Sequence, residues 1–431
     1  MRQSQVCVAA TVRVEALEPL RALLATMTAA PGQADPLNPL VPFAAIDRIH
    51  VARLVLLEDP SLADRRAFPD LPADEPTRLA LIAEGDGSVG ELLDAFAAHA
   101  GEGLPRLFGH REGFAPGDLR GWMGRQRLAP AAAYVNWRGR TVRQVREEAE
   151  LHRVLRACRL SHPHHAPEQL WPLLRRAGES VPLTPLPRPP LGERLSSIAH
   201  FLLLPLLALV LAIPLLIAAP VLIVMLRRRE TSDAVIAPRP SPARNRMLSA
   251  IEDHGVTNQY SAIGTVKPGR FRRWLTIVIL WLIGWAARHV YARGRLGRVN
   301  TIHFASWTFL DDRRRVFFAS NYDGSREAYN DDFINKVAFG LNVSFSNGLG
   351  YPRTDWLIVG GARHEQDFKR FLFHHQIPTQ VWYKAFPGLT TYDMARNARI
   401  RRRPGSPRLP SRARARISVS IPCSAISWAA R

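Results

Sequence analysis

Cysteine is scarce in this sequence, with only three in 431 residues. Their positions, 7, 158 and 423, form no paired spacing, which excludes a disulfide-built scaffold and a cysteine-built zinc site. The patterns GxxxxGK(S/T), HExxH and GxSxG are also missing. The sequence therefore gives no support to P-loop nucleotide chemistry, zinc peptidases or α/β-hydrolases.

Acidic residues are few relative to basic ones: 58 Lys and Arg face 37 Asp and Glu, a net charge of +21. Such an excess favours anionic partners. Residues 401–431, however, hold eight of the arginines and no acid, in an Arg/Ser/Pro/Ala mixture without helical or strand period. We expect this segment to be either a basic disordered tail or a frameshifted sequence. Because the RNP consensus of RNA-binding sheets is also missing, no specific nucleic-acid partner is predicted.

One long hydrophobic run is present. Residues 201–226 contain no charged or strongly polar group, and three arginines follow directly at 227–229. The run exceeds the roughly 20 residues that cross a bilayer as a helix, and the arginines fit a cytoplasmic boundary. A spanning helix is the first interpretation; its three prolines also suit a re-entrant segment, and a buried soluble helix is the third alternative. No cleavable signal peptide is expected, because the apolar run Val6–Val12 is soon interrupted by charged residues.

A shorter apolar stretch spans residues 274–287, with three tryptophans and basic residues on both sides. Fourteen residues are too few for an ordinary span. The stretch is expected either at the membrane interface, with its rings at headgroup depth, or as an ordinary core helix. We expect both folded parts to face the cytoplasm at the cytoplasmic membrane, held there by a hairpin-like or re-entrant unit.

The sequence also contains an internal duplication. IDRIHVARLVLL at 46–57 corresponds to VNTIHFASWTFL at 299–310. A further strand follows in each half and ends in Asp-Gly-Ser, at 86–88 and 323–325, which supplies a turn and a helix cap. Both halves begin with a strand and a helix. Each half is therefore predicted to run strand, helix, strand, strand, helix and closing segment.

The predicted fold class is α+β, with two ferredoxin-like (split βαβ) repeats packed sheet to sheet and one or two membrane-associated helices. The expected boundaries are a first repeat at 1–160, a Pro-rich linker at 161–200, a transmembrane or re-entrant segment at 201–226, a basic loop at 227–257, a second repeat at 258–400 and the basic tail at 401–431.

Several second-half motifs are specific: VKPGRFRR (266–273), IHFASW (302–307), FFASNYDGS (317–325), SNGLGYPRT (346–354) and PTQVWYKAFPGLT (378–390). In these motifs the chain resembles a family of uncharacterised bacterial membrane-associated proteins with tandem ferredoxin-like repeats, which implies no particular activity. At the level of fold alone, the repeats are similar to the dimeric α+β barrel superfamily, which includes dye-decolourising peroxidases and chlorite dismutases. That second likeness implies haem as a cofactor.

Histidines open the matching strands of the two halves, at His50 and His303. By likeness to the haem enzymes, either histidine could ligate haem iron, and Asp323, in its Asp-Gly pair, could act as the catalytic acid. A structural explanation competes with this one, because strand-start histidines bond to neighbouring chain ends and Asp-Gly-Ser forms a turn with an N-cap. No metal site is predicted.

Aromatic residues alternate along the second-half strands. Trp307, Phe309, Phe318 and Trp382 are the candidate lining of an apolar ligand pocket, the alternative being an ordinary core between sheets. The sequence thus predicts a membrane-associated protein that binds an apolar small molecule or a partner protein at the cytoplasmic membrane surface. The alternative is a haem-dependent peroxidase-type oxidoreductase. Whether the chain is an enzyme, its ligand and its oligomeric state are left open.

Overall fold

The computed structural model describes residues 3–402 except 62–63, 66–67, 69–70, 73–74, 111–115, 187–188, 237–239, 292–293 and 295. The chain divides into two compact units. The first comprises residues 1–142 and 187–391, and the second comprises 143–186 and 392–431. The basic tail expected at 401–431 lies outside the described residues from position 403 onward.

The elements follow one another in two similar series separated by helices. The first series is β1 (Gln3–Thr11), α1 (Leu17–Ala25), β2 (Thr28–Ala30), β3 (Gln33–Ala34), β4 (Ile49–Leu57), β5 (Arg78–Asp86), α2 (Val89–His99), α3 (Gly103–Phe108), α4 (Leu119–Arg125) and β6 (Pro130–Val135). The intervening helices are α5 (Val142–Ser161), α6 (Pro167–Glu179), α7 (Leu191–Val210), α8 (Ala212–Ser232) and α9 (Pro242–Ser249). The second series is β7 (Thr257–Thr265), α10 (Arg270–His289), β8 (Ile302–Leu310), β9 (Arg315–Asp323), α11 (Arg326–Phe345), β10 (Thr354–Asp355), β11 (Val359–Gly360), α12 (Glu365–His375), β12 (Val381–Lys384) and α13 (Thr391–Arg402).

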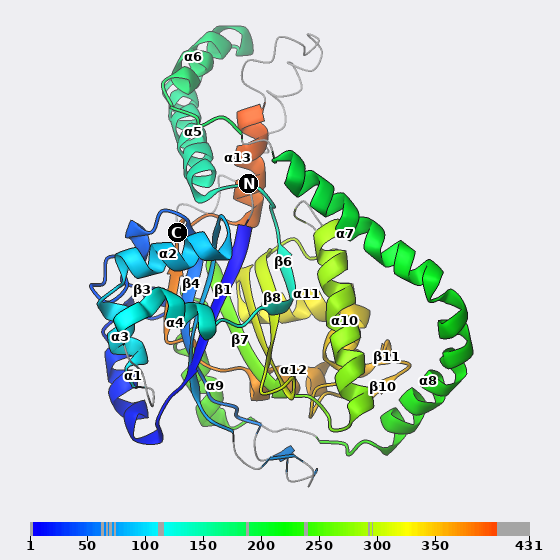
Figure 1. The fold of residues 1–431 in the computed structure, drawn as a ribbon. Coiled ribbons are helices and arrows are strands. Elements are labelled where there is room, and N and C mark those ends of the chain that lie inside the picture. Colours follow the sequence, from blue (N-terminus) through cyan, green and yellow to red (C-terminus); the bar gives the residue numbers. More distant parts are fainter. Residues whose placement is uncertain are drawn as a thin grey trace. The chain divides into compact units, whose positions relative to one another are not determined.

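The first unit is an α+β fold with two four-stranded antiparallel sheets, in the orders β1-β5-β4-β12 and β6-β8-β9-β7 (Figure 1). The strands β1, β4 and β5, and their counterparts β7, β8 and β9, are all nine residues long. The register of β4 shifts between Ile49 and Val51, and that of β8 shifts between Ile302 and Phe304. Equal strand lengths, equal neighbours and equal bulges agree with the predicted duplication.

The closing strands depart from the expected ferredoxin-like order, in which the fourth strand lies beside the first strand of its own half. Instead, β12 pairs with β4, and β6 pairs with β8, so each half completes the sheet of the other. Just before these strands, the chain forms single bridges to the first strand of its own half, Val8 with Arg127 and Ala262 with Gln376. Each closing segment therefore starts in its own half and ends in the other.

The inner faces of the two sheets share one hydrophobic cluster. The first sheet contributes Cys7, Ala9, Val55, Leu57, Ala80 and Ile82, and the second contributes Ile263, Leu310, Phe317 and Ala319. Ile377, which leads into β12, is buried in the cluster, and Leu128, which precedes β6, packs against it. Because these strands bury side chains on both faces, their sequences read as nearly continuous hydrophobic runs.

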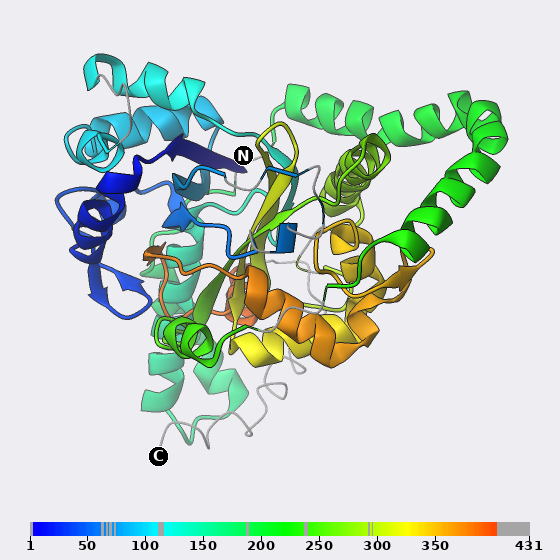
Figure 2. The ribbon, with the colours of Figure 1, turned by 90° about the horizontal axis from the view of Figure 1, so that it is seen from below.

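Helices cover the outer faces of both sheets. Helices α1–α4 lie on the side of the first sheet, and α10–α12 lie on the side of the second (Figures 1 and 2). The apolar stretch expected at 274–287 is thus the central part of α10, which packs on β6 and is half-buried. It follows β7 directly along the chain, in the order that the sequence predicted.

The hydrophobic run at 201–226 forms parts of two helices, α7 and α8, which meet at Leu211. Pro214 explains the break, because proline has no N–H for the carbonyl of Val210 and its ring clashes with that carbonyl. Among the described helices, only α7 is long and apolar enough to count as a candidate membrane span, and none of the qualifying window is buried. A single helix of this kind is weak evidence for a membrane.

The second unit consists of α5, α6 and α13. Glu147 of α5 accepts hydrogen bonds from the backbone N–H of Thr184, at 2.7 Å, and from its hydroxyl group, at 2.5 Å. The Arg401 side chain of α13 also donates to the carbonyl of Thr184. The segment expected as a linker at 161–200 therefore contains a helix, α6, and the first half of α7.

Candidate functional site

A cavity of about 350 Å³ lies on the outer side of the second sheet, beneath α10, α11 and α12. Its volume falls at the lower end of the range of small-molecule sites, roughly 300–1,000 Å³. Apolar and aromatic side chains form most of its wall, among them Tyr260, Trp307 and Phe318 from the strands and Leu280 and Phe333 from the helices. Such a wall recognises a ligand by its apolar surface, because it offers few polar partners.

The structure divides the four residues predicted to line a pocket. Trp307 and Phe318 line the cavity, with their ring centroids 4.9 Å apart. Phe309 packs against the hydrophobic cluster that contains Trp307 and Phe318, but it is not part of the cavity wall. Trp382 lies between the two sheets, where the guanidinium carbon of Arg53 is 5.0 Å from its ring centroid. Its separation from the others follows from the strand exchange, which places β12 in the first sheet.

One histidine that sequence reasoning missed belongs to the cavity wall. His375, the last residue of α12, is 3 % exposed, and its Nδ1 donates to the carbonyl of Phe371 at 2.9 Å. Burial lowers its pKa to about 4, so the imidazole is neutral at pH 7. Within the described part of the chain, its Nε2 has no hydrogen-bond partner. The period of α12 places this position on the buried face, a signal that the sequence does contain.

The cavity reaches the surface between α10 and α11. Leu282 of α10 and Phe339 of α11 both line it, although they are 39 % and 57 % exposed. Helix α11 is interrupted beside this place, because Val337 has non-helical φ and ψ angles of −142° and 31°. An opening flanked by two large apolar side chains suits a ligand that arrives from apolar surroundings.

The predicted histidines and aspartates form two equivalent buried pairs. Nε2 of His50 donates to Oδ1 of Asp86 at 2.9 Å, and Nε2 of His303 donates to Oδ1 of Asp323 at 2.7 Å. The fold brings each pair together because the start of one strand lies beside the end of the next in an antiparallel hairpin. In both halves the residue after the aspartate is a glycine with positive φ, 105° at Gly87 and 87° at Gly324, which turns the chain into the following helix.

Each aspartate also binds the backbone that follows a closing strand. Oδ2 of Asp86 accepts from the N–H of Val142 at 2.8 Å, and Oδ2 of Asp323 accepts from the N–H of Thr391 at 2.7 Å. Burial acts to raise the pKa of Asp323, but the charge and hydrogen bond of His303 and the hydrogen bonds from Thr391 outweigh it. The pKa therefore lies below its ordinary value.

The carbonyl oxygens of the two histidines hold the exchanged strands. The N–H of Ala385 donates to the carbonyl of His50, and the N–H of Asn136 donates to that of His303, both at 2.9 Å. Each pair thus ties its hairpin to both closing segments, which is a structural role. Neither histidine nor Asp323 lines the cavity, and the Nε2 atoms are engaged by carboxylates. Haem ligation and acid catalysis at these residues stay predictions.

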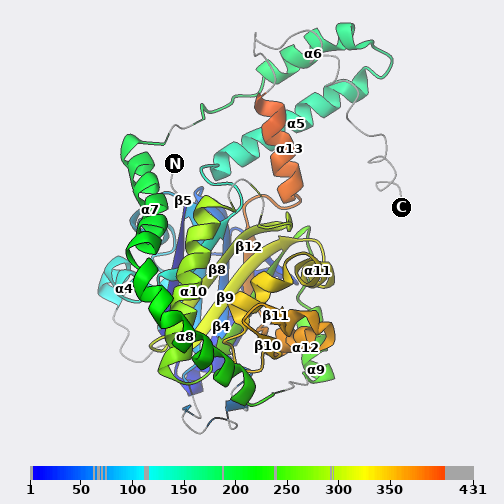
Figure 3. The ribbon, with the colours of Figure 1, turned by 90° about the vertical axis from the view of Figure 1, so that its right-hand side faces the viewer.

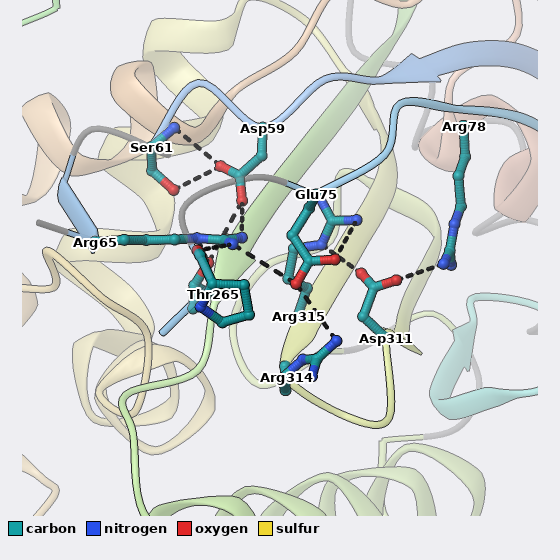
Figure 4. A network of polar contacts seen from close by, with 10 residues as sticks. Asp59, Ser61, Arg65, Glu75, Arg78, Thr265, Asp311, Arg314 and Arg315 are labelled. Carbon is teal, nitrogen blue, oxygen red and sulfur yellow. Dashed lines mark hydrogen bonds and ion pairs between the residues drawn. The ribbon is translucent and has the colours of Figure 1, made fainter. Parts of the chain in front are cut away.

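A buried ionic network lies at the opposite end of the sheets (Figure 4). The Glu75 carboxylate is 3.6–3.9 Å from guanidinium nitrogens of Arg65, Arg314 and Arg315. Asp311 in turn accepts from Arg315 at 2.5 Å. Because acidic and basic groups are interleaved, the network holds the loop between β4 and β5 against the turn between β8 and β9, and its charges are largely neutralised internally.

From the sequence we expected no GxGxxG pattern after a strand, and this is wrong at the junction of β5 and α2. Gly85, Gly87 and Gly90 have the GxGxxG spacing of phosphate-binding loops. Here, however, the site is filled from within: Oε2 of Glu91 accepts from the N–H of Ser88 at 2.7 Å, and Oγ of Ser88 accepts from the N–H of Glu91 at 3.3 Å. The neighbouring strands are antiparallel, unlike those of a dinucleotide-binding unit. The pattern therefore serves a capping box.

Comparisons of the chain with protein-family models, with curated proteins and with solved structures find no significant match. The resemblance to a bacterial membrane-associated family therefore stays a prediction. What the structure establishes is an α+β fold with two four-stranded antiparallel sheets and a cavity on the outer side of the second one.

Proposed function

We propose that this chain is a membrane-attached protein of the cytoplasmic membrane surface that takes an apolar small molecule from the bilayer into the cavity beneath α10 and α11. The observation that carries the proposal is the cavity itself, whose wall is apolar and whose opening is flanked by Leu282 and Phe339. In this proposal the fold is a fused pair of ferredoxin-like repeats that exchange their closing strands, similar in architecture to a dimeric α+β barrel.

Exposed apolar side chains support membrane attachment. Along α7, α8 and Leu211 between them, 17 large apolar residues from 201 to 225 are more than a third exposed. Trp274, Val278 and Leu282 of α10 add to them, with exposures of 63, 49 and 39 %. Water-soluble monomers rarely expose so many large apolar residues on adjoining helices, so a bilayer is the expected surroundings.

The contacts between α7 and α10 support a re-entrant segment, because they fix α7 to the folded first unit. Nδ1 of His200 and Nε2 of His289 in α10 are 2.8 Å apart. Nε1 of Trp285 donates to the carbonyl of Phe201 at 3.3 Å, which Pro205 leaves without an intrahelical donor. The middle of α7 is therefore fixed to the C-terminal part of α10.

The lower end of α8 is fixed to the same unit. The buried carboxylate of Glu230 accepts from the N–H groups of Trp356 and Leu357, at 3.0 and 2.9 Å, and from Thr354 at 3.1 Å. Helices α7 and α8 have 20 and 21 residues, about 60 Å of helix, and they flank a helix of 20 residues, about 30 Å long. The pair forms an arch (Figures 1 and 3). Such an arch dips into one leaflet and returns, because crossing would require one folded unit to lie on both sides of the bilayer.

Photolabelling tests ligand uptake directly. The full chain, reconstituted in lipid nanodiscs, is irradiated with a long-chain alcohol that carries a diazirine, and the labelled peptides are identified by mass spectrometry. We expect labels on the strand residues Trp307 and Phe318, which face the cavity and not the bilayer. Ala262→Phe, which fills part of the cavity, is expected to lower this labelling at least fivefold.

The control variant is Ala98→Phe, which places the same ring on the exposed side of α2 in the first half. It should leave the labelling of Trp307 and Phe318 unchanged, and thermal unfolding of both variants verifies that they fold. Labels restricted to α7 and α8, with no effect of Ala262→Phe, would show that the cavity takes up nothing from the bilayer and would refute the proposal.

A further inference from the structure

The fold brings together four exposed arginines from two segments that lie more than 40 residues apart. Arg228 and Arg229 are in the last turns of α8, and Arg270 and Arg273 are in the first turn of α10. The two segments meet closely: a β-carbon built on Gly269, which precedes α10, would lie 3.8 Å from an Nη atom of Arg229. These four residues are called the basic patch below.

Acidic groups near the basic patch are already used by other cations. Asp233 accepts from Arg272 at 2.5 Å and lies 3.2 Å from Lys267. Glu230 and Asp355 both bind Arg227, at 2.8 and 2.7 Å. In the described part of the chain, no ion pair includes Arg228, Arg229, Arg270 or Arg273. The basic patch therefore carries a net positive charge that no ion pair among the described residues compensates.

Positive charge is also placed unfavourably on α10. The first turn of a helix carries the positive end of the helix dipole, where acidic residues stabilise and basic residues destabilise. Helix α10 has no acidic residue in that turn and no side-chain cap, and Arg270 and Arg273 repel each other as well as Arg229. An anion bound among these arginines removes that repulsion.

The basic patch borders the apolar surface of the arch. Trp274 follows Arg273 directly and is 63 % exposed. In α8, Met225, which is 38 % exposed, and Leu226 directly precede the arginines. Tryptophan and arginine beside a large apolar surface are typical of protein segments at the membrane–water interface, where basic residues contact lipid phosphates. No comparable acid-free group of arginines adjoins apolar surface on α1–α4 of the first half, as far as that half is described.

We propose that the basic patch binds the phosphate groups of anionic phospholipids and so sets the side on which the arch enters the bilayer. This inference rests on the proposed membrane attachment and names its lipid class. Each basic residue close to an anionic surface contributes attraction that salt screens. Binding to anionic vesicles should therefore exceed binding to neutral vesicles and should fall as salt rises.

Vesicle flotation tests the proposal with the full chain, using vesicles of phosphatidylcholine alone and vesicles with about 30 % phosphatidylglycerol. We expect the wild-type chain to bind both, and the anionic vesicles about tenfold more tightly. Arg270→Gln combined with Arg273→Gln should remove most of that tenfold gain while leaving binding to the neutral vesicles unchanged. The matched control removes two exposed arginines of the first half, Arg106→Gln with Arg127→Gln, and should keep the gain.

The outcomes separate the two proposals. Flotation with neither kind of vesicle would refute the membrane attachment itself. Equal binding to both vesicles, or an equal loss in the two double variants, would overturn only the role of the basic patch. Displacement from anionic vesicles by inorganic phosphate, but not by sodium chloride of the same ionic strength, would also overturn it, because the ligand would then be a soluble phosphate and not a lipid.

Discussion

The two halves share their hairpins and differ in what covers them. Both contain a buried His–Asp pair, a glycine turn and a serine-capped helix in the same places, at His50 and Asp86 and at His303 and Asp323. The covering helices differ: α1 has nine residues, whereas its counterpart α10 has twenty. The cavity, the basic patch and the attachments of the arch all involve described residues of the second half.

This contrast assigns different roles to the shared and the unshared features. Residues that recur in both halves hold the exchanged strands together, so they maintain the fold. Features without a counterpart are not needed for that architecture, and they are gathered on the outer side of the second sheet. The candidate functional site is therefore the cavity under α10 and α11. The residues that recur in both halves are not candidates for it.

The largest effect is expected from removing one of the shared aspartates. Asp323→Ala leaves His303 and the N–H of Thr391 buried without their acceptor, which should lower the free energy of unfolding by about 3 kcal/mol. Asp86→Ala should cost about as much, because its contacts are equivalent. Urea unfolding measures both. Asp332→Ala, which removes an exposed partner of Lys336, is the control and should cost less than about 0.5 kcal/mol.

A large loss of unfolding free energy in one aspartate variant and none in the other would contradict this prediction, because the two His–Asp pairs would then not be structurally equivalent. Loss of catalytic turnover without loss of stability would contradict the structural role in a different way and would favour the peroxidase hypothesis.

A moderate, pH-dependent effect is expected at His375, which has no histidine counterpart in the first half. Its pKa is near 6.5 in the unfolded chain and about 4 in the folded one, so between these values the unfolded state binds the proton more tightly. Stability should therefore fall as the pH is lowered from 6.5 toward 4. His375→Phe should reduce the difference in melting temperature between pH 7 and pH 5.

The control for this experiment is His99→Phe, at an exposed histidine of α2. It should leave the pH dependence as it is in the wild-type chain. An unchanged pH dependence in His375→Phe would mean that this imidazole is not buried in its neutral form. His375 would then not be part of the cavity wall.

The smallest effects are expected at the two helix caps. Ser88 of α2 belongs to a reciprocal capping box, whereas Ser325 of α11 accepts a single hydrogen bond from the N–H of Ala328, at 3.2 Å. Replacement by alanine should cost about 1 kcal/mol at either serine. Glu91→Ala removes the other hydrogen bond of the capping box, so it should also lower the free energy of unfolding. We expect no such loss from the corresponding first turn of α11. Thermal unfolding of the four alanine variants, at Ser88, Ser325, Glu91 and Glu327, measures this, and equal costs for Glu91→Ala and Glu327→Ala would contradict it.

The sequence predicted the recurring elements well because their signals are local. Alternating apolar residues, the Asp-Gly-Ser turns and the Ile-His strand starts placed β4, β5, β8 and β9 correctly. The break at Leu211 was also within reach, since prolines in the apolar run suited a bent segment. The sequence singled out His303 and Asp323 but did not predict that they bond to each other, and the contact to Thr391 was likewise found only in the structure.

The exchange of closing strands could not be read from the sequence. A strand such as β12 shows which face is apolar but not which edge it joins, and both edges were open to it. For the same reason Trp382 was grouped with Trp307, although they lie on different sheets. His375 was missed because a histidine at a helix end is usually assigned to the helix dipole, whereas here it is buried in the cavity wall.

The crossed strands have a consequence for biosynthesis. Leu54 pairs with Val381, more than 300 positions later, so β4 leaves the ribosome long before its neighbour exists. At about 5–20 residues per second, this hydrophobic edge waits roughly 15–60 s for its partner. During that interval the unpaired strand edge of the nascent chain can pair with other chains, so we expect this edge to need protection, for example by a chaperone, until β12 is made.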